Sequence, residues 1–472
     1  MSTTTSPDID LGPAWRTLAV ASLAVFAVFL DTTVLFVAFP DIVASFDDVP
    51  TSQLSWVLNA YTIVLAALLV PAGKLADRLG HKRAFLVGSV LFTAASVACG
   101  LAPTAPILIV FRVVQAVGGA TLIPSSFALI LRAFPPAKIP VAIALWGATG
   151  AVAGAVGPTL GAALVEWADW RWVFLVNLPI GAFTVWVGRR HLQESRDPAS
   201  VVPAPLGVVL VIAASALVAL GLVQSESWGW ADARTIGSLL IGLVLLAAFV
   251  LHQRTTTAPA VDLALFAARD FRWGNLATFA FGTAFTAMFL SSILFLTEVW
   301  GYSILRAGFA VAPGPAFVAV LAPRFGALAA QIGQRPLLTV GGAVFAVGGV
   351  WRLLALDGSP SYVVDYLPSM LFTGVGVALC LPQLSSVVAQ SLPPDRLGVG
   401  GGVNQAIRQF GGTLGVALTI ALIATPTSLA DALQHFDLVW WVLIVGGVAT
   451  SILSVPLTPR RATQPTQQRE PV

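Results

Sequence analysis

The chain has little charge for its length. Of its 472 residues, 25 are Lys or Arg and 22 are Asp or Glu, so 10% are charged whereas 57% are hydrophobic. Soluble domains are about 25% charged, so this composition excludes that class and indicates a polytopic helical membrane protein. A membrane β-barrel is excluded because the apolar runs are continuous and lack an alternation of period two.

Cysteine and histidine are also scarce. Cys99 and Cys380 both lie in apolar runs, so no disulfide framework is implied. The four histidines show no metal-ligand spacing, and no Gly-x4-Gly-Lys-Ser/Thr loop is present to bind ATP. The net charge is only +3 and the basic residues are scattered in loops, so nucleic acid is not an expected partner. We expect no metal, no cofactor and no enzyme activity, because no nucleophile–base pair is seen.

What the sequence has in abundance is long apolar runs, and we count fourteen that can cross a bilayer. With both termini cytoplasmic, the inner segments carry 19 Lys and Arg and the outer segments four, as the positive-inside rule requires. We therefore expect a multi-pass protein of the cell membrane. The runs lie near 17–39, 54–72, 84–101, 105–131, 140–164, 172–188, 204–223, 235–251, 275–297, 305–323, 336–355, 365–389, 400–424 and 438–457.

Residues 73–83 form the densest charged cluster, between the second and third runs. Such a cluster cannot lie in hydrocarbon, so it is a short loop at a membrane face. A weaker copy follows at 326–335 with a constant offset of 253 residues, in which Ala330 and Gln331 replace the acid and the base. One loop that occurs twice indicates a transporter built from two related halves.

The two copies are eight spans apart, which two six-span halves separated by two extra spans would explain. The extra spans near 204–251 carry no charge in their apolar parts, so we expect them to face lipid. The predicted organisation is a cytoplasmic tail at 1–16, a six-helix bundle at 17–190, a linker with two extra helices at 191–272, a second six-helix bundle at 273–457 and a cytoplasmic tail at 458–472.

Asp31 is the sharpest single residue, inside the first run and about 13 Å below the outer boundary when counted back from Pro40. An ionisable group at that depth is costly and usually faces a cavity or a partner. Arg112 lies at a similar depth on the fourth run, with Gln115 on the same helix face. A carboxylate near an arginine titrates differently from one near a substrate cation, as proton coupling requires. A purely structural carboxylate or ion pair stays the alternative.

The fifth run contains small residues at spacings of four, among them Gly150, Gly154 and Gly157, followed by Pro158. Small residues allow helices to approach closely, and proline adds a kink. Whether this surface only packs or also gates is left open. Glu298 near the outer end of the ninth run and Arg408 inside the thirteenth are further candidates for a pathway.

These segments together resemble the major facilitator superfamily, and within it the fourteen-span drug:H+ antiporter-2 family. The loop at 73–83 is similar to the signature Gly-x-Leu-Ala-Asp-Arg-x-Gly-Arg/Lys-Arg/Lys, and 112–115 matches the fourth-helix Arg-x-x-Gln motif. The glycine run that ends at Pro158 matches the fifth-helix motif of exporters. Residues 169–181 and 408–412 resemble stretches characteristic of the fourteen-span group.

The resemblance implies a proton-coupled exporter that moves amphipathic, often cationic, small molecules by alternating access, with the proton gradient as its energy source. The family usually has Asn where Phe36 stands, so the local pocket is expected to be more apolar than usual. An exporter or facilitator of a natural metabolite, lipid or siderophore on the same fold is the alternative. We expect a monomer whose partners are the substrate, protons and the lipid bilayer.

The resemblance also implies roles for individual residues, with Asp31 as the coupling carboxylate beside Arg112. The charged loop would latch the cytoplasmic side of the outward-open state. The substrate pathway is expected to include Asp31, Phe36, Gln115, Glu298 and Arg408. Conformational gating is expected at Gly73, Asp77, Arg78, Gly80, Lys82, Arg83, Gly150, Gly154, Gly157 and Pro158.

Overall fold

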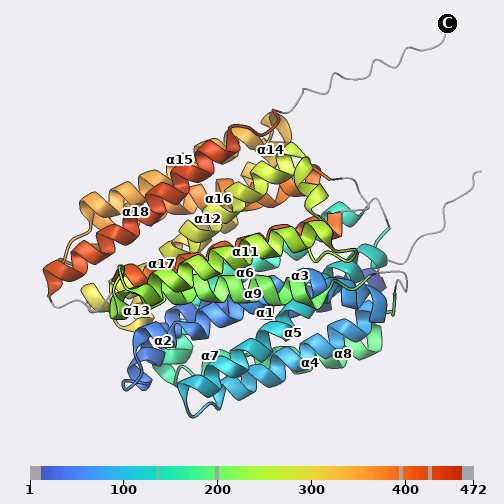
Figure 1. Cartoon of the computed structure of the whole chain (residues 1–472), viewed down its shortest axis with the longest axis horizontal. Coiled ribbons are helices and arrows are strands. Elements are labelled where there is room, and N and C mark those ends of the chain that lie inside the picture. The colour runs from blue at the N-terminus through green and yellow to red at the C-terminus, as the bar shows by residue number, and fades with distance from the viewer. Residues whose placement is uncertain (1–11, 136–137, 197–200, 393–396, 424–427, 460–472) are drawn as a thin grey trace, which may run out of the picture.

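The computed structural model describes residues 12–135, 138–196, 201–392, 397–423 and 428–459, and within them every regular element is a helix (Figure 1). The first group is α1 (Gly12–Ser45), α2 (Thr51–Leu54), α3 (Trp56–Leu79), α4 (His81–Gly100), α5 (Ala105–Ala133), α6 (Ile139–Trp167), α7 (Trp172–Leu175) and α8 (Asn177–His191). The middle of the chain forms α9 (Pro205–Val223), α10 (Ser225–Trp228), α11 (Ala233–Thr255) and the 3-10 helix η2 (Leu263–Ala267).

The second group completes the chain, with two short π-helices, η3 and η4, next to its longer helices. It comprises α12 (Arg269–Leu294), η3 (Phe295–Val299), α13 (Ile304–Val311), α14 (Pro313–Ile332), α15 (Gln334–Ala355), η4 (Tyr362–Tyr366), α16 (Leu367–Gln390), α17 (Leu397–Ile423) and α18 (Leu429–Ser454).

Thirteen helical segments in the described residues are long and apolar enough to cross a membrane. The fourteenth is α6, whose parts Leu145–Gly154 and Val156–Trp167 meet at a bend of 41°. Pro158 lies just past the bend and cannot donate a backbone hydrogen bond to the carbonyl of Gly154, which accounts for the kink. The expected all-α polytopic membrane fold is confirmed.

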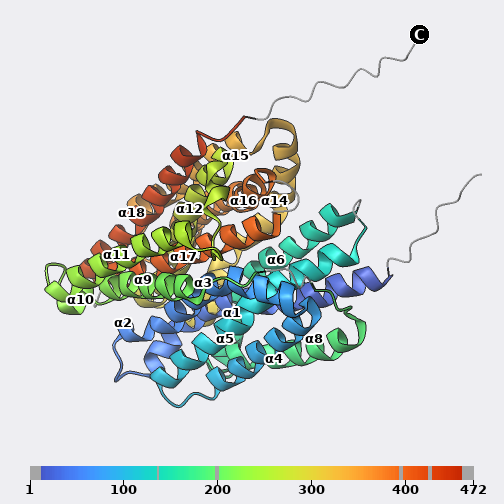
Figure 2. The ribbon, with the colours of Figure 1, turned by 45° about the vertical axis from the view of Figure 1, so that its right-hand side comes forward.

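The two groups lie on opposite sides of the molecule (Figures 1 and 2), and in Figure 1 α9 and α11 cross in front of its middle. Within the first group, α4 packs on α5 and α8, and α1 packs on α6. Within the second, α15 packs on α16 and α18, and α12 packs on α17. The groups meet where α3 packs on α17 and where α6 packs on α13.

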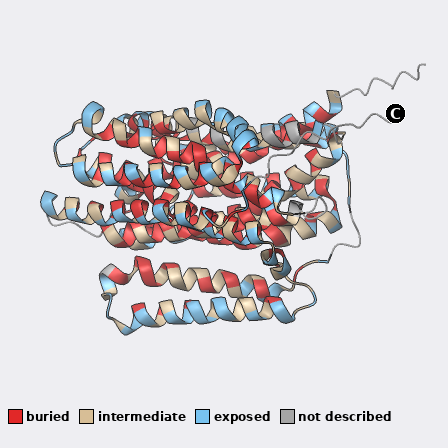
Figure 3. Cartoon of the chain, turned by 90° about the horizontal axis from the view of Figure 1, so that it is seen from above, coloured by how far each residue is buried: buried red, intermediate tan, exposed pale blue. Residues whose placement is uncertain are grey.

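Burial separates the helices that form the interior from those that face outward (Figure 3). In the most apolar part of the segment Thr51–Leu79, which comprises α2 and α3, 83% of residues are buried, whereas the corresponding figure for α11 is 17%. Large apolar side chains such as Leu240, Val244 and Leu251 on α11 are exposed. A lipid bilayer stabilises such a surface because hydrocarbon solvates apolar side chains.

The first span is longer than the sequence suggested. Helix α1 continues through Pro40 to Ser45 instead of ending near residue 39. Asp31 is therefore fourteen residues, or about 21 Å, from the end of its helix, rather than about 13 Å below a boundary at Pro40. The carboxylate lies nearer the middle of the bundle than the sequence count placed it.

The loop that occurs twice has the same backbone in both copies. Gly80 and Gly333 end α3 and α14 with φ values of 113° and 87°, a region that favours glycine. The N–H of Gly80 donates to the carbonyl of Ala76 over 2.9 Å, and that of Gly333 donates to Ala329 over 2.9 Å. The repeat with an offset of 253 residues is therefore present in the backbone at the two helix ends as well as in the amino-acid sequence.

Candidate functional site

A buried polar network surrounds Asp31. Its Oδ2 lies 2.6 Å from Nη1 of Arg112, and each side chain is only 1% exposed. Gln115 donates from Nε2 to Oδ1 of Asp31 over 2.8 Å, and its own Oε1 accepts from Arg112 over 2.7 Å. The spacing of three residues on α5 brings Arg112 and Gln115 to one face, as the sequence predicted, and that face meets α1.

Asn177 completes the network, and sequence reasoning missed it as a site residue. Its Nδ2 donates to Oδ1 of Asp31 over 3.2 Å and to Oγ of Ser96 over 3.0 Å. The hydroxyl of Ser96 donates in turn to the carbonyl of Phe174 over 2.9 Å. Asn177 falls in the stretch 169–181, whose resemblance to the fourteen-span group was the one available signal.

The guanidinium of Arg112 is held on all sides. Its Nε donates to the carbonyl of Val57 over 2.9 Å. The ring of Tyr61 lies 3.9 Å from its central carbon, and that of Phe174 lies 5.7 Å away. A desolvated cation on an aromatic face gains about 2 kcal/mol. Arg112 therefore keeps a fixed position opposite Asp31.

This geometry defines what a proton could do at Asp31. All three contacts of the carboxylate are made by donors, so the arrangement suits the ionised acid, which can only accept. A proton on Asp31 removes its charge and with it the attraction to Arg112. Because α1, α5 and α8 each contribute to the network, the Asp31 carboxylate connects three helices.

Phe36 lies further along α1 and touches the other group of helices. Its ring centroid is 5.6 Å from that of Phe289 on α12, and the side chain is 6% exposed. Phe289 in turn lies 6.1 Å from Phe285. The residue that departs from the family pattern is thus an aromatic contact between the two groups.

The small residues of α6 divide into occupied and open positions. An added Cβ at Gly157 would lie 2.8 Å from Cβ of Thr33, and one at Gly150 would lie 3.3 Å from the ring of Phe29. At the residue after Gly157, α6 meets the other group of helices, since an added Cβ at Gly308 of α13 would lie 2.9 Å from the carbonyl oxygen of Pro158. An added Cβ at Gly154 meets no atom within 4 Å.

The charged loop is fastened by a residue far along the chain. Glu194 accepts from the backbone N–H groups of Lys82 and Arg83 over 3.0 and 3.2 Å, which caps the start of α4. An added Cβ at Gly80 would lie 2.7 Å from the carboxyl carbon of Glu194. Glu194 was not among the sequence candidates, since it lies in a charged stretch after the sixth apolar run with no motif around it.

The remaining loop residues differ in their contacts. Asp77 lies 3.6 Å from His81 and 3.9 Å from Lys74. Arg78 is exposed and has no ion pair among the described residues. An added Cβ at Gly73 would lie 3.2 Å from Pro124 of α5, so this glycine permits a close helix contact.

Glu298 and Arg408 are not part of the Asp31 network. Glu298 lies on η3 and is exposed. Arg408 lies within α17 and donates to Oε1 of Gln405. The structure therefore joins Asp31, Arg112 and Gln115, and leaves the other two charged candidates elsewhere.

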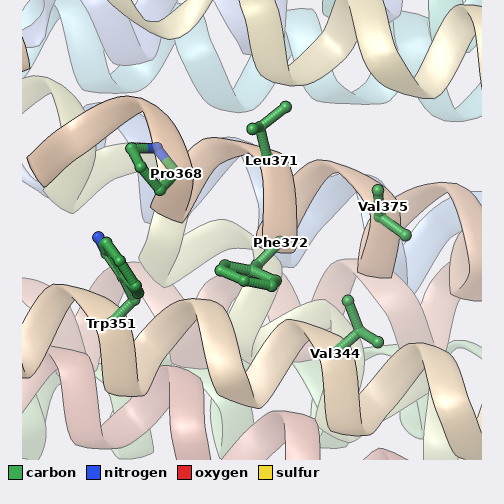
Figure 4. Close-up of a pocket in the computed structure, with 6 residues that line it drawn as sticks. All are labelled: Val344, Trp351, Pro368, Leu371, Phe372 and Val375. Atoms are coloured by element: carbon green, nitrogen blue, oxygen red, sulfur yellow. The ribbon is translucent and has the colours of Figure 1, made fainter. Parts of the chain in front are cut away.

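Two further features bear on ligands. Among the described residues, no group of three or more His, Cys, Asp or Glu side chains is placed to hold a metal. A groove of about 460 Å³ lies between α15 and α16, lined by Val344, Trp351, Pro368, Leu371, Phe372 and Val375 (Figure 4). It lies outside the polar network, and its lining is apolar.

Comparisons with known proteins identify the family. The model of the Major Facilitator Superfamily matches residues 21–416. The chain is 32% identical over 419 residues to the tetracenomycin C resistance and export protein of Streptomyces glaucescens, which covers 88% of this chain and 77% of that protein. It is 34% identical over 412 residues to the multidrug resistance protein Stp of Mycobacterium tuberculosis, covering 86% and 75%.

Solved structures agree on the fold. The crystal structure of a D-xylose-proton symporter superposes with a TM-score of 0.70 at 13% identity, covering 94% of this chain and 98% of that one. At this identity the likeness concerns the fold alone. The family match extends over most of the chain, and we conclude that this protein belongs to the major facilitator superfamily.

Proposed function

We propose that this protein is a proton-coupled exporter of amphipathic small molecules that works by alternating access. The observation that carries the proposal is the buried network of Asp31, Arg112, Gln115 and Asn177, in which every printed contact of the carboxylate comes from a donor. The relatives are named as an antibiotic export protein and a multidrug resistance protein, which supports export of small organic molecules. Members of this superfamily are transporters, so we propose no enzyme activity and no cofactor.

We further propose that residues 17–190 and 273–457 move as two units, with 191–272 as the linker between them. The contact of Phe36 with Phe289 and that of α6 with α13 would then close one end of the molecule in this conformation. The excess of basic residues in the inner segments supports a cell-membrane protein with cytoplasmic termini. In Figure 1 the start of α1 and the end of α18 both lie towards the right.

The test is uphill transport by purified protein in liposomes with an imposed pH gradient. We expect an amphipathic dye to accumulate against its own gradient, and the accumulation to collapse when an uncoupler is added. Arg254→Gln is the matched control, because this exposed residue of α11 lies away from the network. If dye movement does not depend on the pH gradient in either the unmodified protein or Arg254→Gln, proton coupling is refuted.

A further inference from the structure

Arg408 lies in the middle of α17 without an acidic partner. It is the twelfth residue of the helix, about 16 Å from its start at Leu397, yet its side chain keeps partial exposure. It donates to Oε1 of Gln405, and no carboxylate of the described residues lies within ion-pair distance of it. A guanidinium has five N–H donors, so most of its donors remain available.

Gln405 adds a second donor at the same place. Its Oε1 is occupied by Arg408, and its Nε2 is buried without a hydrogen-bond partner in the described part of the chain. A buried donor that stays unsatisfied is costly. Arg408 and Gln405, called the donor pair below, therefore present N–H groups that an acceptor would satisfy.

The donor pair lies on the side of α17 between its contacts with α12 and with α3. On one side of it, an added Cβ at Gly411 would lie 3.2 Å from a backbone nitrogen of α12. On the other side, the hydroxyls of Thr413 and Thr62 of α3 lie 2.8 Å apart. Helical spacing places the donor pair between these two contacts. Gly401 shares that side, and an added Cβ there meets no atom within 4 Å.

An aromatic surface lies beside the donor pair. Gly282 of α12 packs on the backbone of Arg408, where an added Cβ would lie 2.9 Å from its carbonyl oxygen. Phe285 and Phe289 follow Gly282 at helical spacing on the same side of α12, with ring centroids 6.1 Å apart. Phe36 extends this surface from α1. Donors and phenyl rings thus border one region.

The charges of the interior favour an anion there. Among the described acidic residues only Asp31 is buried, and Arg112 already neutralises it. Arg352 is also fully buried, and it bonds Ser292 over 2.8 Å rather than a carboxylate. The interior therefore carries more positive than negative charge, which repels a cation and attracts an anion.

We propose that the donor pair binds the anionic group of an aromatic organic acid, and that the exported class is aromatic carboxylates and phenolates rather than cations. Arg408 supplies a planar fork that matches a carboxylate in two parallel hydrogen bonds. The phenyl rings of Phe285 and Phe289 cover the aromatic body of the substrate. This inference rests on the proposed exporter function and names the substrate class of that same pathway.

Two dyes built on one ring system test the inference, the anionic fluorescein and the cationic rhodamine 6G. Both are measured in liposomes with an imposed pH gradient, for the unmodified protein and for Arg408→Gln, Arg408→Lys and the control Arg254→Gln. We expect the unmodified protein to export fluorescein. Arg408→Gln should raise the KM for fluorescein roughly 10- to 100-fold through loss of a charged hydrogen bond, and Arg408→Lys should raise it less. Thermal stability should stay nearly unchanged, because the guanidinium of Arg408 bonds only to Gln405 of its own helix among the described residues.

Each other outcome has a definite meaning. Export of rhodamine 6G but not of fluorescein by the unmodified protein would overturn the inference and leave the exporter function standing. An unchanged KM for fluorescein in Arg408→Gln would overturn the role of the donor pair. If neither dye moves with the gradient, the exporter function and the inference both fall.

Discussion

Each of the two groups of helices contains an arginine and a glutamine three residues apart, and they differ in one partner. In α5, Arg112 and Gln115 bond each other and share Asp31. In α17, Arg408 and Gln405 bond each other and have no carboxylate among the described residues. The first pair is sealed and the second is partly exposed. The same two side chains can thus hold a proton-sensitive ion pair or present free donors, depending on a single acid.

The largest effect is expected from removing that acid. Asp31→Asn keeps the shape of the side chain, but Arg112 is left buried without an anion, at a cost of about 3 kcal/mol or more. We expect the variant to insert in the membrane, to melt at a lower temperature and to lose uphill export. The measurement is dye accumulation in liposomes beside a melting curve. Full gradient-driven export by this variant would remove Asp31 from the coupling step.

The glycines of α6 sharpen the comparison between occupied and open surfaces. Gly157 faces Thr33 of its own group, so Gly157→Leu overpacks a closed contact and should destabilise the protein by about 1–3 kcal/mol. Gly154 faces open space, so Gly154→Leu should change stability by less than about 0.5 kcal/mol.

Transport measurements distinguish a surface that only packs from one that also takes part in gating. If the two groups of helices approach each other at Gly154 in another conformation, Gly154→Leu will fold normally and yet export slowly or leak. Melting temperature and export are measured on the same purified samples. Equal losses of stability and export in both variants would leave packing as the only role of the run.

A smaller effect is expected from giving the second pair the acid that it lacks. Gln405→Glu places a carboxylate beside Arg408, much as Asp31 lies beside Arg112. We expect the new ion pair to occupy the guanidinium and to raise the KM for fluorescein about tenfold, since loss of one charged contact is worth at least that much. Gln405→Met, which removes the amide without adding charge, is the control and should raise it less. Equal values in the two variants would show that charge at this position does not matter.

The sequence was informative where chemistry depends on residue type and helical spacing. Asp31, Arg112 and Gln115 stood out because ionisable and strongly polar groups are rare in apolar runs. The spacing of three residues also places Arg112 and Gln115 on one helix face. Asn177 did not stand out, because a single amide in an apolar run is uncharged and does not by itself indicate a functional site. Its role depends on how α8 is rotated against α1, which packing decides.

Contacts between distant segments also could not be predicted from the sequence. Glu194 caps α4 from more than a hundred residues away, and nothing in its neighbourhood signals this. Gly154 and Gly157 look equivalent as letters, but a rotation of α6 by part of a turn separates a filled position from an empty one. Phe36 was recognised as a departure from the family pattern, but its partner Phe289 follows from how the two groups meet.

The smallest effects are expected at the loop that occurs twice, which has kept its backbone and lost its charges in the second copy. Gly80 and Gly333 end their helices alike, but Asp77 has Ala330 as its counterpart. Asp77 makes half-exposed contacts with Lys74 and His81, and pairs of this kind contribute about 0.2–1 kcal/mol.

Asp77→Ala should therefore destabilise one conformer of the transport cycle and slow turnover about two- to fivefold. The KM should change little, because Asp77 lies at the end of α3 and not beside the donor pair. Gln331→Ala, in the copy that already lacks the acid, should leave turnover and KM within experimental error. Initial rates at several dye concentrations separate the two constants. A large rise in KM for Asp77→Ala would place the loop on the substrate pathway, and a clear effect of Gln331→Ala would show that the second copy still gates.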